Sequence, residues 1–375
     1  MGLPNIKFKK QGGGLARREP SKDHISCLYF IGTPPTSWSG NTYNEVLSPE
    51  HAIQLDLIPD SINYGVAYFH IEEFFRIAPG AKLYVAFKTD ETSVAALQQV
   101  LNGEIRQFAV DLTATAFSLL KITALQAEAD KMFSAKTPAS IVTSFDFATV
   151  APASLPEILP VSPAEAPAVS VMVGSFGNGG IPLLGILLGA IAKASVHESI
   201  LWIEKFNVDN PLSPMSPVFF NGAAPESLTP VQLEGVETKR YIFLRKYPGI
   251  AGVYFNNSHT CTPVSSDYAY IENVRTMDKA IREIYLKILP STGAPVYVDP
   301  ATGKLTPDMC SFFEDLANQA LEQMERDREL SGYKVFVDPD QNILTTGELV
   351  FVIKQVPVGV VRQMKVKISY TTKID

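Results

Sequence analysis

The spacing of hydrophobic and polar positions predicts alternating strands and helices in the first part of the chain. Short apolar runs that stop at turn-forming residues are typical of buried strands. They occur at Ile25–Ile31, Lys82–Phe87 and Ser140–Phe145. Helical spacing covers 93–101 and 113–133, with Asp111 as the expected N-cap of the second helix. This alternation predicts an α/β layer.

Proline interrupts the middle of the chain. Residues 148–168 hold five Pro and six Ala, which predicts an extended connector on the surface because proline fixes φ and lacks a backbone donor. A strand at Val169–Val173, an apolar helix within 181–194 and a strand at Ser199–Phe206 follow. The apolar stretch has 14 residues, too few to span a bilayer, and is expected to be a buried helix.

The last third of the chain has the most regular pattern. Two long helices, Asn273–Leu289 and Asp308–Leu330, each have one apolar stripe at helical spacing. The strands expected here are Tyr241–Leu244, Gly252–Phe255, Lys334–Val337, Glu348–Gln355 and Val360–Tyr370. With 375 residues the chain is long enough for two domains, and the whole pattern predicts an α/β (α+β) fold.

Charge is unevenly distributed along the chain. Residues 1–23 carry six Lys or Arg and two Asp or Glu, and residues 360–375 carry four and one, although the net charge of the whole chain is −7. Two basic ends therefore flank an acidic body, which makes a poor partner for nucleic acid. The ends are either solvated tails or docking segments for the acidic body of a neighbouring copy.

The N-terminus and the cysteines indicate the cellular compartment in which the protein is made. No apolar run follows Lys7, Lys9 and Lys10, so the N-terminus does not resemble a secretory signal. The three cysteines form no CxxC pair and are odd in number, which argues against a disulfide framework. We expect a soluble protein made in a reducing cytoplasm.

Two stretches resemble ligand-binding loops, and each lacks a required part. Ile181-Pro182-Leu183 follow the glycine-rich stretch Gly174–Gly180, where a phosphate-binding loop needs Lys and then Ser or Thr. Asp338, Asp340 and Asn342 have the spacing of a calcium loop, but its Gly and Glu positions are Ile and Leu. A loop entering a buried helix and the turn of a hairpin are the better interpretations.

Candidate metal ligands and nucleophiles are equally incomplete. His24 with Cys27 and His259 with Cys261 are single pairs without a second pair, which is too few for a zinc site. The stretch Ser265–Asp267 has no Gly-x-Ser-x-Gly context. The sequence therefore predicts no catalytic, cofactor-binding or metal residues, and this favours a structural protein over an enzyme.

The final predicted strand, Val360–Tyr370, leaves two interpretations open. Val366, Ile368 and Tyr370 alternate with Lys365 and Lys367. Such a strand can pair with the sheet edge of another subunit, where main-chain hydrogen bonds supply affinity and alternating side chains set the register. It can equally close the sheet of its own chain.

The order of several stretches resembles the contractile tail sheath family of phages and related injection machines, most of all its compact branch long labelled as uncharacterised phage proteins. These stretches are Gly189–Asn207, Tyr241–Phe255, Asp267–Asp278, Asp338–Asn342 and Pro357–Val358. Asn273, Val274 and Arg275 match the start of the C-terminal domain of that family. The likeness covers 40–375 and is firmest over 189–370.

The resemblance implies an α/β insertion-type domain over 24–245, a C-terminal assembly domain over 246–358, and arms at 1–23 and 359–375 that exchange strands with neighbouring copies. The arm residues expected at subunit contacts are Lys7, Lys9, Lys10, Arg17, Arg18, Arg362, Lys365, Val366, Lys367, Ile368 and Tyr370. The chain is short for a sheath protein, which implies that outer decorating domains are missing.

The resemblance also implies a helix that faces an inner tube, and Asp308–Leu330 is its best match. Residues 309–330 contain six acids and two Arg. The expected tube-facing residues are Glu314, Asp315, Glu322, Glu325, Arg326, Asp327 and Glu329. Screened surface pairs of about 0–1 kcal/mol each suit a contact that is released on contraction.

The implied function is mechanical. Subunits would stack as helical rings around a tail tube and rearrange to drive it through a cell envelope, without a nucleotide or other cofactor. The implied partners are other copies, the tail tube protein, and baseplate and tail terminator proteins, with no nucleic acid and no membrane insertion. The location would be a virion tail assembled in the host bacterial cytoplasm, or a cytoplasmic contractile injection machine. The alternatives are a non-contractile tail or adhesin-like component, and an enzyme with an undetected site.

Overall fold

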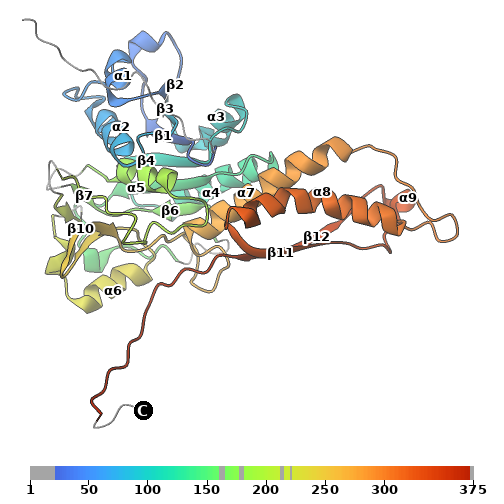
Figure 1. Ribbon diagram of the computed structural model, residues 1–375. Coiled ribbons are helices and arrows are strands. Elements are labelled where there is room, and N and C mark those ends of the chain that lie inside the picture. The colour runs from blue at the N-terminus through green and yellow to red at the C-terminus, as the bar shows by residue number, and fades with distance from the viewer. Residues whose placement is uncertain (1–21, 160–164, 177–180, 212–214, 220–221, 372–375) are drawn as a thin grey trace, which may run out of the picture.

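The computed structural model describes residues 22–159, 165–176, 181–211, 215–219 and 222–371. Figure 1 shows an α/β layer, a long helical hairpin beside it, and a C-terminal segment that runs outward from the molecule. This mixture of a mainly parallel sheet with separate antiparallel hairpins confirms the α/β (α+β) fold class.

A six-stranded sheet forms the centre of the layer in the order β2-β3-β1-β4-β5-β6. Its strands are β1 (Ser26–Ile31), β2 (Tyr43–Val46), β3 (Leu83–Lys88), β4 (Gln107–Ala116), β5 (Ser140–Asp146) and β6 (Val169–Val171). The edge strand β2 is antiparallel to β3, and the other neighbours are parallel. Parallel strands are covered on both faces, which explains their nearly continuous apolar runs.

Helices cover both faces of this sheet. The helices α1 (Pro49–Gln54), α2 (Gly65–Ile77) and α5 (Leu184–Lys193) enclose one core with the strands. On the other face lie α3 (Val94–Val100) and α4 (Leu119–Ser134). The helix α5 approaches α2 closely because Gly185 has no side chain: a Cβ there would lie 2.3 Å from the carbonyl oxygen of His70.

Smaller elements complete the layer beside its two cores. They are β7 (Ser175–Phe176), β8 (Pro217–Val218), α6 (Pro230–Thr238), β9 (Leu244–Tyr247) and β10 (Ile250–Phe255). Tyr241 and Phe243 are buried with residues of β4 and β5. Leu244 of β9 and Val253 and Phe255 of β10 are buried in the first core, so this antiparallel pair has its base in the α/β layer.

The C-terminal lobe, residues 271–357, packs two helices on a two-stranded sheet. Its elements are α7 (Ile271–Ile288), α8 (Pro307–Arg326), β11 (Leu330–Val337), α9 (Ile343–Thr346) and β12 (Phe351–Pro357). Leu321 and Met324 of α8 and Val335 of β11 form a small core with Ala280 of α7. Ile284 and Ile288 of the stripe predicted for α7 also pack against this core, whereas Tyr285 of α7 and Phe312 of α8 are exposed.

The helix predicted over 113–133 begins later than expected. The strand β4 continues to Ala116, and α4 starts at Leu119. Asp111 is not an N-cap, because it lies in β4, where its Oδ1 accepts a hydrogen bond from the backbone of Thr113 at 2.9 Å. The β-branched residues Thr113 and Thr115 favour the strand that the prediction replaced by helix.

The strand predicted at Ser199–Phe206 is also wrong. The backbone amides of Lys205 and Phe206 both donate to the carbonyl of Trp202, which folds the segment into turns. An ion pair of 2.5 Å between Lys205 and Glu198 closes the same segment. Tertiary packing here overrides the strand preference of an apolar run.

The proline-rich connector and the end of the helix α8 also differ from the predictions. Leu155 and Ile158 of the proline-rich connector are buried in the second core, so its described part is not confined to the surface. The helix predicted to reach Leu330 ends at Arg326 because Arg328 has a φ of 61°, after which Leu330 begins β11. The elements β2, α1, α2, β7, β8, α6 and α9 and the first part of β4 had no counterpart in the predicted pattern.

Candidate assembly interface

The C-terminal arm, residues 358–371, extends away from the lobe (Figure 1). Val366, Ile368 and Tyr370 are exposed, from 77% for Val366 to 107% for Tyr370. Within the described residues the arm belongs to no sheet. The alternating pattern predicted for 360–370 is therefore present as an extended, solvated segment, and it does not close the sheet of its own chain.

The sheet β11–β12 has open edges and an uncovered face. It contains two strands in the described part of the chain, so each strand has one side without a strand neighbour. Phe336 pairs with Val352 across the sheet, and Val356 lies further along the same face. All three are exposed, although the opposite face packs on α8. Unpaired edges of this kind are templates for a strand from another chain.

Arg362 behaves differently from the other predicted arm residues that the structure describes. Its guanidinium lies 3.4 Å from the centre of the Tyr270 ring and donates to the carboxylate of Glu272. It also lies 3.4 Å from the hydroxyl of Ser258. Arg362 is therefore held by its own body, whereas Lys365 and Lys367 are exposed.

The predicted N-terminal arm residues Lys7, Lys9, Lys10, Arg17 and Arg18 lie outside the described residues. The described chain begins just after them. There the carboxylate of Asp23 lies 2.8 Å from the Nζ of Lys279 on α7. The root of the N-terminal arm is thus tied to the same helix whose first turn holds Arg362.

The acids predicted on α8 divide into exposed and engaged groups. Asp315 and Glu325 are exposed. Glu322 pairs with Arg326 at 2.9 Å within the helix, and Glu314 accepts a hydrogen bond of 2.8 Å from the backbone of Val337. The outer face of α8 is therefore acidic, but part of its charge is already paired.

Asp327 and Glu329 lie beyond the end of α8 and differ from each other. Asp327 is exposed and accepts hydrogen bonds of 3.0 Å from Gln323. Glu329 is buried and lies 2.7 Å from the Nζ of Lys279, so it does not share the outer face of α8. The reason is the reversal of the chain at Arg328, which turns Glu329 toward α7.

Sequence reasoning missed the charged face of α7. Glu272, Arg275, Lys279 and Arg282 recur three or four residues apart, a spacing that puts them on one side of a helix and was the available signal. Arg275 donates to the carbonyls of 194 and 195, and Arg282 donates to that of 138. Burial lowers the pKa of Arg275 to about 10. This face therefore fixes the lobe to the α/β layer.

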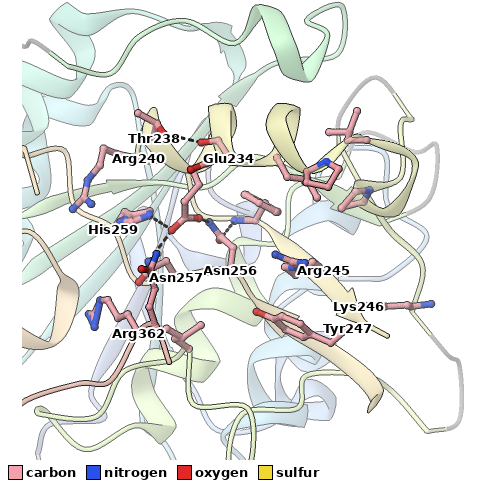
Figure 2. A pocket seen from close by; sticks show the side chains of 18 of the residues that line it. Glu234, Thr238, Arg240, Arg245, Lys246, Tyr247, Asn256, Asn257, His259 and Arg362 are labelled. Atoms are coloured by element: carbon pink, nitrogen blue, oxygen red, sulfur yellow. Dashed lines mark hydrogen bonds and ion pairs between the residues drawn. The ribbon is translucent and has the colours of Figure 1, made fainter. Parts of the chain in front are cut away.

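A groove of about 1150 Å³ lies beside Arg362 at the start of the C-terminal arm, between α6 and the β9–β10 hairpin (Figure 2). Glu237 lines this groove and accepts hydrogen bonds from His259 at 2.7 Å and from Asn257 at 2.8 Å. Burial alone would raise the pKa of Glu237, but the hydrogen bonds from His259, Asn257 and Asn256 hold it at about 2.

The Glu237–His259 pair is a hydrogen-bonded contact that lines the groove. Burial lowers the pKa of His259, so the ring is neutral and donates from Nε2 to an ionised carboxylate. The carboxylate of Glu237 therefore does not titrate near pH 7, where a general acid or base would have to exchange a proton. The pair therefore joins α6 to the segment after β10.

Both cysteines that were weighed as metal ligands or nucleophiles are buried in one core. Cys261 and Cys27 are buried in the second core, and burial raises the pKa of Cys261 to about 12, which leaves it unreactive at neutral pH. Among the described residues, no group of three His, Cys, Asp or Glu could hold a metal ion. The positions 177–180 of the glycine-rich stretch lie outside the described residues.

The aspartates weighed as a calcium loop follow β11. Asp338 accepts a hydrogen bond of 2.9 Å from the backbone of Asp340, and the side chain of Asn342 caps α9. The stretch therefore begins the connection between the antiparallel strands β11 and β12, as the hairpin interpretation expected.

No helix within the described ranges is long and apolar enough to cross a membrane.

Comparison with solved structures finds two chains of similar fold. A chain of the anti-feeding prophage (AFP) baseplate, 6-fold symmetrised, matches with a TM-score of 0.67 and 16% identity over 99% of this chain and 100% of that chain. A chain of the AFP baseplate in the contracted state matches with a TM-score of 0.59 and 11% identity over 98% of each chain. At these identities the likeness shows a shared fold. No curated protein matches this chain.

Comparison with family models identifies both parts of the sequence. Residues 81–259 match DUF2586, N-terminal domain, and residues 267–375 match DUF2586, C-terminal domain. The two matches follow each other in sequence order and together cover well over half of the chain. The chain therefore belongs to the DUF2586 family.

Proposed function

We propose that this protein is a structural subunit of a contractile injection machine and, within such a machine, the sheath subunit that polymerises around a tail tube. The observation that carries the proposal is the fold shared over 99% of this chain with a chain of the AFP baseplate. That chain is matched over its whole length as well, so the likeness extends to the arm-bearing C-terminal part. A structural, non-enzymatic role is part of this proposal.

The arm is the proposed link between neighbouring subunits. It presents Val366, Ile368 and Tyr370 to solvent, and the β11–β12 sheet presents open edges beside exposed Phe336 and Val352. An arm from one copy would add a strand to this sheet in another, with backbone hydrogen bonds for affinity and alternating side chains for register. The exposed apolar face is typical of a surface that is covered on assembly.

The outer face of α8 is the proposed contact with the tube. Asp315, Glu322 and Glu325 give it an acidic character that suits a basic partner. Exposed ion pairs of about 0–1 kcal/mol each would hold the tube weakly and release it as the sheath contracts. Contraction would be a rotation of rigid bodies that repacks subunit interfaces, while the arms keep the rings connected.

The proposed surroundings follow from this role. Besides other copies and the tube, the sheath would meet a baseplate at one end and a terminator at the other, in a virion tail or a related injection particle. A second candidate is a baseplate component that does not polymerise, which the AFP baseplate titles favour. The two candidates differ in whether copies of the chain form extended helical assemblies.

Negative-stain electron microscopy tests the proposal. The chain is co-expressed with its tube protein, and long helical assemblies around the tube are the expected result. A second sample lacks 360–375, and it should remain folded by circular dichroism yet fail to polymerise. A chain without the last four residues, 372–375, is the length control and should assemble. Persistent monomers of the full chain at high concentration beside the tube would refute the sheath role.

A further inference from the structure

The arm touches its own body through a buried ion pair at Arg362. Its partner Glu272 stands in the first turn of α7, and the side chain of Glu272 is only 2% exposed. The carboxylate accepts a hydrogen bond of 2.7 Å from Ser258 on one oxygen and is paired with Arg362 on the other. A buried carboxylate needs such a counter-charge, because its transfer from water is strongly unfavourable.

The pocket around Arg362 fits a guanidinium in shape as well as in charge. The Arg362 guanidinium lies over the Tyr270 ring, with 3.4 Å between Cζ and the ring centre. Its Nη2 nitrogen reaches Glu272 and Ser258. Stacking combined with a carboxylate contact suits the flat, always charged guanidinium better than the compact ammonium of lysine. The site therefore selects arginine specifically.

The chain on both sides of this residue is exposed. Val361 is 69% exposed and Met364 is 82% exposed, whereas the side chain of Arg362 is 17% exposed. A Cβ built on Gly359 would meet nothing within 4 Å, so open space surrounds the backbone between β12 and the pocket. One side chain therefore fixes an otherwise solvated segment.

We propose that the Arg362–Glu272 pair is a releasable clamp that sets where the C-terminal arm leaves the body. While it is closed, the mobile part of the arm begins after residue 362. When it opens, the arm begins after Pro357, and the five freed residues lengthen its reach by up to about 17 Å at 3.3–3.6 Å per residue. The longer arm would then span a changing distance between subunits, and this role rests on the proposed sheath function.

The start of the N-terminal arm is also held by α7. Lys279 of α7 holds Asp23 at 2.8 Å, seven residues beyond Glu272 and on the same helix face. Opposite charges on one helix thus hold the starts of both arms. A pull on either arm reaches α7, which Arg275 and Arg282 tie to the α/β layer.

Limited trypsin digestion of the isolated full-length monomer tests the clamp. Trypsin cuts after Arg362, Lys365 and Lys367 only where the chain is accessible, and mass spectrometry separates the products. In the wild type we expect cutting after Lys367 and protection after Arg362. Glu272→Gln should raise the rate after Arg362 about tenfold relative to the rate after Lys367, the change that opening an interaction of 1.4 kcal/mol gives. Glu283→Gln on the same helix is the control and should leave the ratio unchanged.

A second variant covers the case in which Glu272→Gln unfolds the body. The double variant Glu272→Gln with Arg362→Met leaves no buried charge unpaired, so the body should stay folded. Nitroxides at 287 and 368 should then report a broader distribution of distances than in the wild type, and Lys365→Met should leave it unchanged. Equal cutting after Arg362 and Lys367 in the wild type, or identical distributions, would overturn the clamp. Both measurements use monomers, so a failure to polymerise would refute the sheath role and leave the clamp standing.

Discussion

The α/β layer and the C-terminal lobe use the same kinds of elements but differ in completeness. In the layer, helices cover both faces of six strands, and the two cores are enclosed within one chain. In the lobe, α7 and α8 cover one face of a two-stranded sheet, and Phe336, Val352 and Val356 remain exposed on the other. A two-stranded sheet is marginal alone in water. The layer therefore encloses its cores within one chain, whereas the lobe leaves an apolar sheet face exposed.

The largest expected loss of stability comes from a substitution in the α/β layer, where α5 packs closely on α2. Gly185→Ala places a Cβ 2.3 Å from the backbone oxygen of His70, and two helix backbones would have to separate. We expect the free energy of unfolding to fall by more than about 4 kcal/mol, measured by urea denaturation. Gly235→Ala on α6 is the matched control, because its Cβ would meet nothing within 4 Å. Equal stability of the two variants would contradict the close packing of α5 on α2.

The next effect separates the lobe from the layer. Leu321→Ala removes a fully buried side chain from the small core of the lobe and should cost about 3–4 kcal/mol there. Because that core is separate from those of the layer, we expect local opening. Hydrogen exchange should speed up in α8, β11 and β12 and stay slow in β1, β4 and β5. The exposed Gln319→Ala should change neither region, and uniform acceleration in Leu321→Ala would show a single cooperative unit.

Acid should weaken the layer through His70. Burial lowers the pKa of His70 to about 4, below the unfolded value of 6.5, so the folded state favours the neutral ring. Its stabilising effect is complete above pH 6.5 and declines as the pH falls toward 4, by up to about 3 kcal/mol. His70→Phe should flatten this part of the stability curve, measured by urea denaturation at pH 4.5 and 7.0. Identical curves for both proteins would show that His70 does not drive the acid loss.

The smallest effect on folding concerns the outer face of α8. Exchanging Asp315, Glu322 and Glu325 for Asn or Gln should change the free energy of unfolding by less than about 1 kcal/mol, because exposed charges contribute little to stability. If α8 faces the tube, the same variant should bind the tube more weakly in co-sedimentation, and the difference should shrink at high salt. Exchanging Glu348, which is exposed outside this face, is the control. Unchanged tube binding would remove α8 from the proposed contact.

Strong local patterns allowed correct predictions for several elements. The apolar runs at β1, β3 and β5 and the stripes of α7 and α8 were recognised because period and length both favoured one structure. Predictions failed where local preference and packing disagreed. Trp202 and Phe206 form an apolar run like those of the strands, but an ion pair and turn hydrogen bonds fold it back.

The candidate interface was predictable in part for the same reason. The alternation of the arm is visible in its sequence, and the structure describes that segment as extended and exposed. The division among its basic residues was not visible, because Arg362 and Lys365 look alike in a list of charges. Glu329 was grouped with the acids of α8 because a helix reaching Leu330 was expected, whereas a left-handed residue at 328 ends it.

The sequence by itself determined the fold class, the two long helices and the basic, alternating character of the C-terminal arm, because these depend on local period and composition. Only the tertiary structure decided which charges are buried together. Arg362 lies 90 residues beyond Glu272 and 104 residues beyond Ser258 in the chain. Glu272 and Ser258 meet because α7 begins beside the segment that follows β10. Burial makes each such group depend on its partner, and no local pattern records a partner ninety residues away.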